Sequence, residues 1–236
     1  MSAKQFLVSL LPGSLQGRLL YHFRPALRQP WGGPFNGQDG RRAIFDSLVK
    51  NFAPEAIVET GTFRGDTTRY MAGRCAAPVY TAEFDARNVG FASENLRGLS
   101  NVRISRGDSR AFLDNLRLPQ SRVFFYLDAH WGEDLPLAEE IRIIFEKTPV
   151  PLVMIDDFKV PGDAGYGYDD YGAGSALIPE YIEALCSRFG MSQFYPALPS
   201  ALETGARRGC VLLAADPAVV ATLAADPLLK KPPLHS

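Results

Sequence analysis

The sequence predicts an α/β protein in which helices cover both faces of a mostly parallel sheet. Between residues 41 and 215, short apolar runs typical of strands alternate with segments of helical periodicity. Such alternation is typical of βαβ units, whose strands are parallel and buried on both faces. A glycine-containing strand end at residues 57–68, IVETGTFRGDTT, and an acid after each of five strands predict a ligand site at one edge of the sheet.

The composition is that of an ordinary globular protein. The chain has 236 residues, of which 46% are hydrophobic and 22% are charged, enough for one domain with a sizeable core. A formal net charge of −1 does not indicate a nucleic-acid binder, and no apolar run reaches the roughly 18 residues of a membrane span. Cys75, Cys186 and Cys210 show neither a disulfide framework nor metal-binding spacing, which favours a cytoplasmic location.

The chain divides into three parts. Residues 1–40 are rich in proline and basic residues and read as an N-terminal arm with a short helix near 14–23. We expect this arm to pack over the core or to support a homodimer. Residues 41–215 form the main domain, and residues 216–236 form a C-terminal helix and tail.

The elements of the main domain follow in a regular order. Ile44, Leu48 and Phe52 have helical spacing and predict a helix before the first strand. The predicted strands are 56–60, 79–83, 102–105, 123–128, 152–156, a stretch near 192–202, and 210–214. The predicted helices between them are 67–72, 89–96, 109–116, 137–145 and a segment near 178–189.

Gly61 and Gly65 bring a backbone loop to the end of the first predicted strand. Glycine permits positive φ and a close approach of the backbone to a ligand. The dinucleotide fingerprint needs a middle glycine, and Phe63 replaces it, which argues against a cradled pyrophosphate. Glu59 before the loop repels phosphate and suits a cationic ligand. An ordinary strand-to-helix turn is the alternative interpretation.

Acids at the strand ends suggest distinct roles around a nucleoside. Glu83, about 20 residues beyond the glycines, can accept hydrogen bonds from both hydroxyls of a ribose. Asp108 can accept one from the exocyclic amine of adenine, and Glu59 with the Gly61 backbone can face a charged amino-acid portion. Each acid could instead be a helix cap, although five in succession argue against that interpretation.

Asp128, Asp156 and Asp157 follow two neighbouring strands and form a different group. Carboxylates that converge repel one another unless a proton or a cation intervenes. Oxygen ligands of this kind suit Mg²⁺ or a similar ion. The sequence therefore predicts a divalent cation at Asp128, Asp156 and Asp157.

The pattern E-x-G-x-x-x-G, followed by Glu83, Asp108 and Asp128, resembles class I S-adenosylmethionine-dependent methyltransferases over about residues 41–215. The pairing of LDAHW with MIDDF is similar to the metal-dependent O-methyltransferases of the catechol type and of the bacterial sugar and macrolide type. The resemblance implies a Rossmann-like seven-stranded sheet with an antiparallel last strand, and Mg²⁺ at the three aspartates. It also implies a cofactor site, whose residues would be Glu59, Gly61, Thr62, Gly65, Glu83, Asp108 and Asp128.

The sequence departs from that pattern at two positions. Trp131 stands where catechol-type enzymes commonly place a lysine base, and an Asp-Asp pair replaces Asp-Asn. His130 is the substitute base, since its pKa suits proton transfer near neutrality, with a structural role as the alternative. Asp128 would act with it at the catalytic centre. A loop containing Tyr166, Tyr168 and Tyr171 reads as a lid or as an ordinary surface loop.

We therefore expect a methyltransferase that uses a divalent cation to methylate a hydroxyl on a sugar, a natural product or a phenol. Its partner would be a small-molecule acceptor, without nucleic acid or a membrane span. A nicotinamide-dependent oxidoreductase on a similar sheet is one alternative. A noncatalytic binding protein that has kept the fold is the other.

Overall fold

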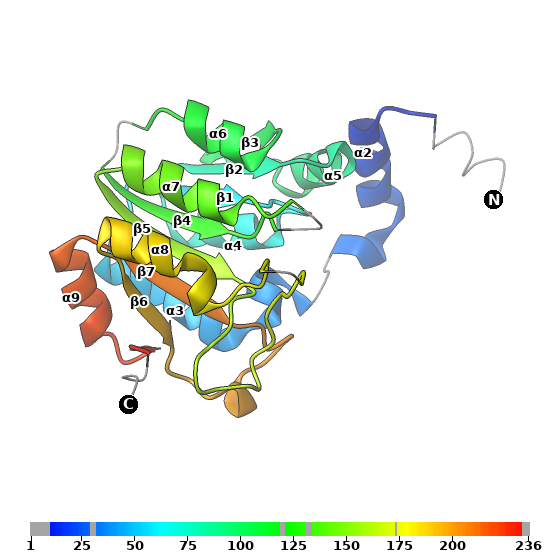
Figure 1. Cartoon of the computed structure of the whole chain (residues 1–236). Helices are drawn as coiled ribbons and strands as arrows, with labels where there is room; N and C mark the ends of the chain where they lie inside the picture. The colour runs from blue at the N-terminus through cyan, green and yellow to red at the C-terminus, as the bar shows by residue number, and fades with distance from the viewer. Residues whose placement is uncertain (1–9, 29–31, 119–120, 131–133, 173, 233–236) are drawn as a thin grey trace.

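The structure, a computed structural model, describes residues 10–28, 32–118, 121–130, 134–172 and 174–232. It confirms the α/β prediction, because helices cover both faces of one mostly parallel sheet (Figure 1). In the described residues this sheet has eight strands in the order β3-β2-β1-β4-β5-β7-β6-β8. They are β1 (Ala56–Thr60), β2 (Val79–Glu83), β3 (Val102–Arg106), β4 (Arg122–Leu127), β5 (Val150–Asp156), β6 (Ser192–Pro196), β7 (Cys210–Ala214) and β8 (Leu229–Lys230).

The pairing of the strands matches the expected topology. Strands β1 to β5 pair in parallel, whereas β7 runs antiparallel to both β5 and β6. The antiparallel strand at 210–214 was therefore predicted correctly. Strand β8 extends the sheet beyond the seven expected strands, and its two residues are too few to show a periodic pattern.

The sixth strand is shorter than the predicted stretch near 192–202. It ends at Pro196, and the 3₁₀ turn η4 (Ser200–Leu202) follows Pro199. Pro196 still pairs with Leu229 of β8, and Pro199, which has no backbone N–H to donate, stands where the chain turns into η4.

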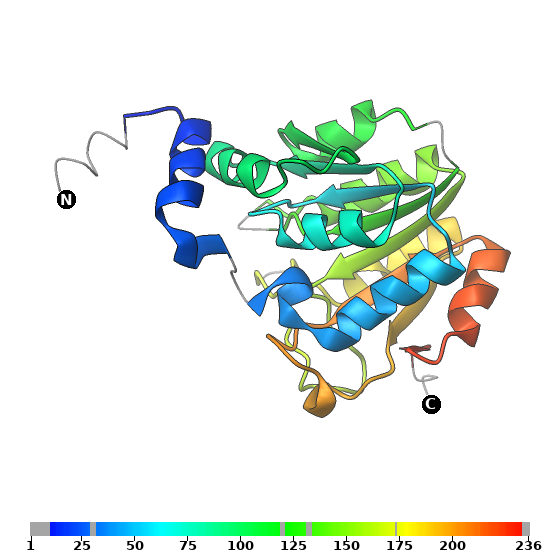
Figure 2. The ribbon, with the colours of Figure 1, turned by 180° about the vertical axis from the view of Figure 1, so that it is seen from behind.

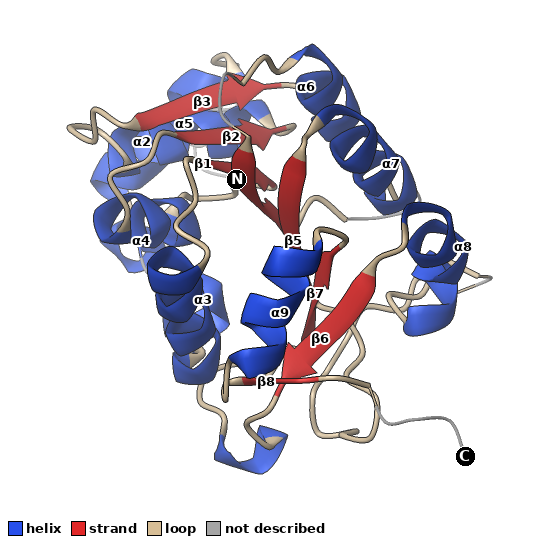
Figure 3. Ribbon diagram, turned by 90° about the vertical axis from the view of Figure 1, so that its left-hand side faces the viewer, coloured by secondary structure: helices blue, strands red, loops and turns tan. Residues whose placement is uncertain are grey.

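Two layers of helices enclose the sheet (Figure 3). The first core cluster contains residues of α6, α7 and α8, and the second contains residues of α3, α4 and α9. The helices are α2 (Gly13–Phe23), α3 (Asp39–Asn51), α4 (Asp66–Arg74), α5 (Ala86–Asn95), α6 (Ser109–Asn115), α7 (Leu137–Lys147), α8 (Pro179–Phe189) and α9 (Pro217–Ala225). Across the described residues, every helix is too short or too polar to cross a bilayer.

The N-terminal region runs along the outside of the domain before it enters the core. Helix α2 packs against α5, and the 3₁₀ turns η1 (Pro25–Arg28) and η3 (Pro34–Gly37) follow (Figure 2). Phe35 of η3 is 1% exposed and packs edge-on against Tyr126 of β4, with ring centroids 5.2 Å apart. The end of this region is thus anchored beneath the sheet edge that carries the strand-end acids.

The strand order changes direction between β1 and β4. From β1 the chain proceeds outward through β2 to β3 and then returns to β4 on the other side of β1. In α/β sheets a ligand crevice forms outside the carboxyl ends of the strands at such a switch point. The ends of β1 and β4 are therefore where the candidate site is expected.

Candidate functional site

The glycine loop lies directly against the end of β4. Gly61 has a φ of 86°, and a Cβ built on it would come within 2.2 Å of the carbonyl oxygen of Asp128. The amide of Asp128 donates to the carbonyl of Thr60 at 2.9 Å. Gly65, with a φ of 82°, begins α4. Only glycine allows the loop to approach β4 this closely without strain.

Glu83, at the end of β2, holds this loop in place. One carboxylate oxygen accepts from the backbone N–H of Phe63 at 2.7 Å, and the other accepts from that of Asp85 at 2.8 Å. Burial raises the pKa of Glu83 above its ordinary value. A carboxylate has about four acceptor positions, and beside these two N–H groups only the side chain of Asn88, among the described residues, acts on Glu83 as a donor, so an acceptor position remains for a ligand. The structure therefore places Glu83 beside the glycine loop, where a ribose was predicted.

Glu59 is a buried residue at the start of the glycine loop. Its side chain is 1% exposed and accepts hydrogen bonds from the hydroxyls of Thr68 and Thr81. Thr62, also predicted to bind the cofactor, turns its buried hydroxyl toward Thr81 at 2.5 Å. Burial raises the pKa of Glu59 to about 7. One oxygen of Glu59 thus links the loop to α4 and β2, and its role toward the amino-acid portion of a cofactor stays a prediction.

Two of the strand-end acids are helix caps. The carboxylate of Asp108 accepts from the N–H groups at the start of α6 and pairs with Arg110 at 2.7 Å. Arg110 lowers the pKa of Asp108. Asp85 caps α5 in the same way. Among the described residues Oδ2 accepts only from Arg110, so Asp108 can cap the helix and still accept a further hydrogen bond, and its role as an adenine acceptor stays a prediction.

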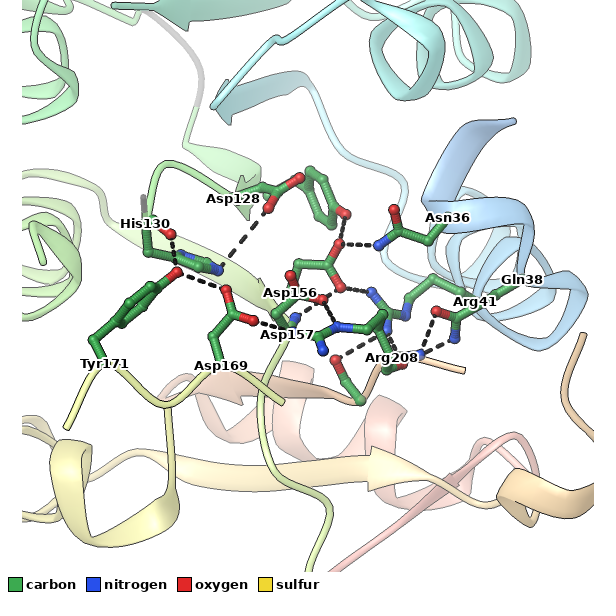
Figure 4. Close-up of polar contacts among 12 residues, drawn as sticks. Asn36, Gln38, Arg41, Asp128, His130, Asp156, Asp157, Asp169, Tyr171 and Arg208 are labelled. Atoms are coloured by element: carbon green, nitrogen blue, oxygen red, sulfur yellow. Dashed lines mark hydrogen bonds and ion pairs between the residues drawn. The ribbon is translucent and has the colours of Figure 1, made fainter. Parts of the chain in front are cut away.

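Asp128, His130 and Asp157 converge at the end of β4 and β5 (Figure 4). One ligand atom from each lies within 4.8 Å of the others, and we call them the Asp-His-Asp group. The ring of His130 is 1% exposed, and neither nitrogen has a hydrogen-bond partner among the described residues. Burial of an imidazole without a hydrogen bond costs folding free energy unless an ion or another ligand binds its nitrogens.

The pKa values of all three side chains in this group are shifted toward the uncharged form. Burial, together with Asp156 and Asp157, raises the pKa of Asp128 well above its ordinary value. Burial and Asp156 raise the pKa of Asp157 to about 7. Burial lowers the pKa of His130, which keeps the ring neutral near pH 7. A divalent cation would relieve the repulsion between the carboxylates, and a neutral imidazole can serve as its ligand. The side chains therefore fit a cation.

Asp156 is not part of the Asp-His-Asp group, contrary to the predicted set of metal ligands. It forms an ion pair with Arg41 of α3, and both side chains are 1% exposed. Tyr126 donates to its second oxygen, as does Asn36 at 3.2 Å. Burial alone would raise the pKa of Asp156, but Arg41 and Tyr126 lower it below the ordinary value. Both oxygens are thus occupied, and His130 takes the place expected for Asp156.

Arg208, just before β7, connects the group to the loop that follows β5. Its Nε donates to Asp157 at 2.7 Å, and its guanidinium also pairs with Asp169. Gln38 fixes the Arg208 backbone, accepting from its N–H at 2.8 Å and donating to its carbonyl at 2.9 Å. Asp157 itself has a φ of 52°, a strained value for an aspartate.

The three tyrosines of the predicted lid have different positions. The hydroxyl of Tyr171 contacts the backbone carbonyl of His130 and the carboxylate of Asp169. Tyr166 is 2% exposed and belongs to the core, while the ring of Tyr168 lies beside Lys159. Only Tyr171 of these three therefore touches the candidate site. Trp131, which stands in the sequence where catechol-type enzymes commonly have a lysine base, lies outside the described residues.

Sequence reasoning missed several residues that shape the site. Arg41 lies on the same helical face as Ile44 and Leu48, and an arginine in an apolar stripe signals a buried anionic partner. Arg208 in the turn GARRG was harder to find, because a pair of basic residues before a strand is only a weak indication of a partner in the site. Nothing in the local sequence indicated Gln38 or Asn36, because their contacts reach across more than 100 residues.

Comparisons with protein-family models and with curated proteins find no match for this chain. Solved structures resemble it in fold. An O-methyltransferase from Streptomyces achromogenes involved in tomaymycin synthesis, in complex with SAM, is 16% identical with a TM-score of 0.59, covering 89% of this chain and 94% of that one. An O-methyltransferase from Bacillus cereus in complex with SAH is 16% identical with a TM-score of 0.58, covering 90% and 96%.

A third similar structure is an amino pentose methyltransferase from Micromonospora echinaspora involved in calicheamicin biosynthesis. It is 14% identical with a TM-score of 0.53 and covers 75% of this chain and 90% of that one. These likenesses show that the chain has the Rossmann-like fold of these three methyltransferase structures.

Proposed function

We propose that this chain is an S-adenosylmethionine-dependent methyltransferase that transfers a methyl group to a hydroxyl with the help of a divalent cation. The observation that carries the proposal is the placement of Glu83, the glycine loop and Asp128 side by side at the switch point. The fold likeness to methyltransferase structures described in complex with SAM or SAH supports it.

The cofactor would lie across the carboxyl ends of β1 and β2. The carboxylate of Glu83, with acceptor capacity beyond its two backbone hydrogen bonds, suits the hydroxyls of a ribose. Gly61 lets the loop lie directly against the backbone of Asp128, so that the backbone of the loop itself would line the place of the amino-acid portion. The sulfonium cofactor supplies an activated methyl group, and the task of the chain is to hold it in line with the acceptor oxygen.

Asp128, His130 and Asp157 would hold the divalent cation. When bound, such an ion lowers the pKa of a hydroxyl and orients it. Arg208 holds Asp157 from the opposite side, so that this carboxylate is positioned before any ligand arrives. His130 can bind a cation or accept a proton, but its ring cannot do both with the same nitrogen. The buried, unpartnered state of both nitrogens favours the ligand role.

The acceptor would enter beside Tyr171, whose hydroxyl contacts the carbonyl of His130. A hydroxyl on a sugar, a natural product or a phenol is consistent with a site of oxygen ligands and one aromatic ring. One of the similar structures acts in tomaymycin synthesis and another is an amino pentose methyltransferase, which supports the first two classes.

The test is transfer of a labelled methyl group from S-adenosylmethionine to representatives of the three acceptor classes, with Mg²⁺ and with EDTA. We expect label in a hydroxyl of at least one class, and only when the metal is present. Transfer that survives full chelation would remove the cation from the proposal. Binding of the cofactor without transfer to any hydroxyl acceptor would contradict O-methylation.

A further inference from the structure

One face of α2 is fixed against α5 by direct contact between the two backbones. A Cβ built on Gly17 would lie 1.8 Å from the carbonyl oxygen of Arg87, and one built on Gly90 would lie 1.9 Å from that of Ser14. Tyr21, one turn beyond Gly17, packs edge-on against Phe91. These contacts determine which side of α2 is turned away from the domain.

The side turned away carries a second apolar stripe. Leu15, Leu19 and Phe23 recur every four residues on the face of α2 opposite Gly17. Leu15 is 41% exposed and Phe23 is 75% exposed, and Leu10, just before the helix, is 67% exposed. Figures 1 and 2 show α2 at the outer edge of the molecule from both sides, with α5 beside it and η1 after its end. The stripe therefore has no partner within the described chain.

The surroundings of the stripe are cationic. Residues 1–38 contain Lys4, Arg18, Arg24 and Arg28 and no aspartate or glutamate. Arg24 and Arg28 are exposed. Arg28 also donates to the carbonyl of Tyr21 at 3.0 Å and lies over the Tyr21 ring, and Arg18 forms an ion pair with Glu94 at 3.8 Å. An exposed apolar stripe flanked by cations is complementary to a surface that is apolar inside and anionic outside.

A second copy of the chain fits this face less well. Two α2 helices in contact would bring the same cationic residues together. Helix α2 has 11 residues and is roughly 16 Å long, whereas a stable interface buries about 800 Å² on each partner. A lipid surface does not require shape complementarity, since an amphipathic helix lies in the headgroup region with its apolar face about 5–10 Å deep.

We propose that α2 docks this protein on anionic membrane surfaces. Leu10, Leu15 and Phe23 enter the boundary between headgroups and acyl chains. Arg24 and Arg28 lie at the level of the lipid phosphates, where each cation adds to the attraction. The proposal does not depend on the enzymatic activity, because α2 lies outside the Asp-His-Asp group and its contacts.

The test is co-sedimentation of the full chain with vesicles of phosphatidylcholine alone and with vesicles containing phosphatidylglycerol. We expect binding to the anionic vesicles, weakened by salt, and none to the neutral ones. The double variant Leu15→Ser and Phe23→Ser should lower the partition coefficient about tenfold or more. Its matched control is Leu202→Ser, which alters a side chain of similar exposure (69%) on η4 and should leave binding unchanged.

A second pair of variants isolates the charge. Arg24→Gln with Arg28→Gln should lower binding about tenfold or more, whereas Arg117→Gln on the loop after α6 should not. Wild-type protein that ignores anionic vesicles would overturn the proposal, as would binding that both double variants retain. A dimer that the Leu15 and Phe23 double variant dissociates, seen by light scattering without vesicle binding, would identify a second copy as the true occupant.

Discussion

Arg41 and Asp156 form an ion pair that is sealed inside the protein, with 1% of each side chain exposed. The pair joins α3 to the end of β5, directly beneath the Asp-His-Asp group. Arg41 also donates to the carbonyls of Arg208 and Gly209, so one guanidinium ties together the two strands that border the site. Asp156 therefore serves as the fixed base of the site, and Asp157 beside it faces the crevice.

Removing one member of this pair should be more damaging than removing both charges. Arg41→Met leaves a buried carboxylate uncompensated and should lower the free energy of unfolding by about 3–5 kcal/mol. Adding Asp156→Asn should recover part of that loss, because no buried charge then remains. Urea denaturation of the two variants measures both values. A single variant that loses less than about 1 kcal/mol would show that the pair is not buried as described.

The close approach of Gly61 to Asp128 gives a matched pair of variants. Gly61→Ala introduces a Cβ 2.2 Å from the Asp128 carbonyl at a φ of 86°, whereas Gly98 has a φ of 90° and nothing within 4 Å. Both alanines suffer the same backbone strain, of order 1 kcal/mol. Only Gly61→Ala should also displace the end of β4 and weaken cofactor binding about tenfold or more. Equal affinity in the two variants would show that the contact does not shape the site.

The Asp-His-Asp group predicts a specific pattern of metal binding. Calorimetry with Mn²⁺ alone should show one site in the wild-type chain, and Asp157→Asn and His130→Ala should each weaken it at least tenfold. Asp170→Asn, on the loop after β5 but outside the group, is the matched control. Metal affinity that His130→Ala leaves unchanged would contradict the ligand role.

In that case His130 would return to the role of base predicted from the sequence. His130→Ala should then lower kcat by about 10²–10⁴ and abolish the acidic limb of the rate profile, because only a neutral imidazole accepts a proton. The two roles are thus separated by whether the variant changes metal affinity or the pH profile.

Glu140 predicts a pH dependence of stability that is independent of the site chemistry. This residue of α7 is fully buried, and neither oxygen accepts a hydrogen bond within bonding distance, although Thr60 and Ser109 are near enough to oppose the shift in part. Burial raises the pKa of Glu140 from its ordinary value of 4.5 to about 7. The folded chain therefore binds this proton more tightly than the unfolded chain does. The stability that the proton provides is complete below pH 4.5 and is lost as the pH rises to about 7.

Glu140→Gln should accordingly be more stable than the wild type near pH 8, by about 1–3 kcal/mol, and nearly equal to it near pH 4. Urea unfolding across this range measures the difference, with Glu183→Gln on the exposed side of α8 as control. A difference between Glu140→Gln and wild type that stays constant with pH would refute the raised pKa.

The sequence predicted the fold well because its signals are local and repeated. Apolar runs at 56–60 and 79–83 coincide with β1 and β2, since both strands are short and bounded by turn residues. The edge of the sheet that carries the site was also predictable, because ligands of α/β proteins bind at the carboxyl ends of the parallel strands. The contacts of the individual acids did not follow, because a helix cap such as Asp108 and a carboxylate paired with a distant arginine, such as Asp157, look alike in sequence. Arg41 and Arg208 decide which carboxylates stay available, and their partners lie 115 and 51 residues away.

The measurement that tests the central claim most directly is isothermal calorimetry with S-adenosylmethionine, S-adenosylhomocysteine and NAD, on the wild-type chain and on Glu83→Ala. We expect the first two to bind at one site and NAD not to bind. Glu83→Ala should weaken that binding by about 1.5–3 kcal/mol, the scale of hydrogen bonds to a charged group. Binding of NAD in preference to S-adenosylhomocysteine, or binding of neither, would contradict the account. Unchanged affinity in a folded Glu83→Ala variant would remove Glu83 from the ribose site.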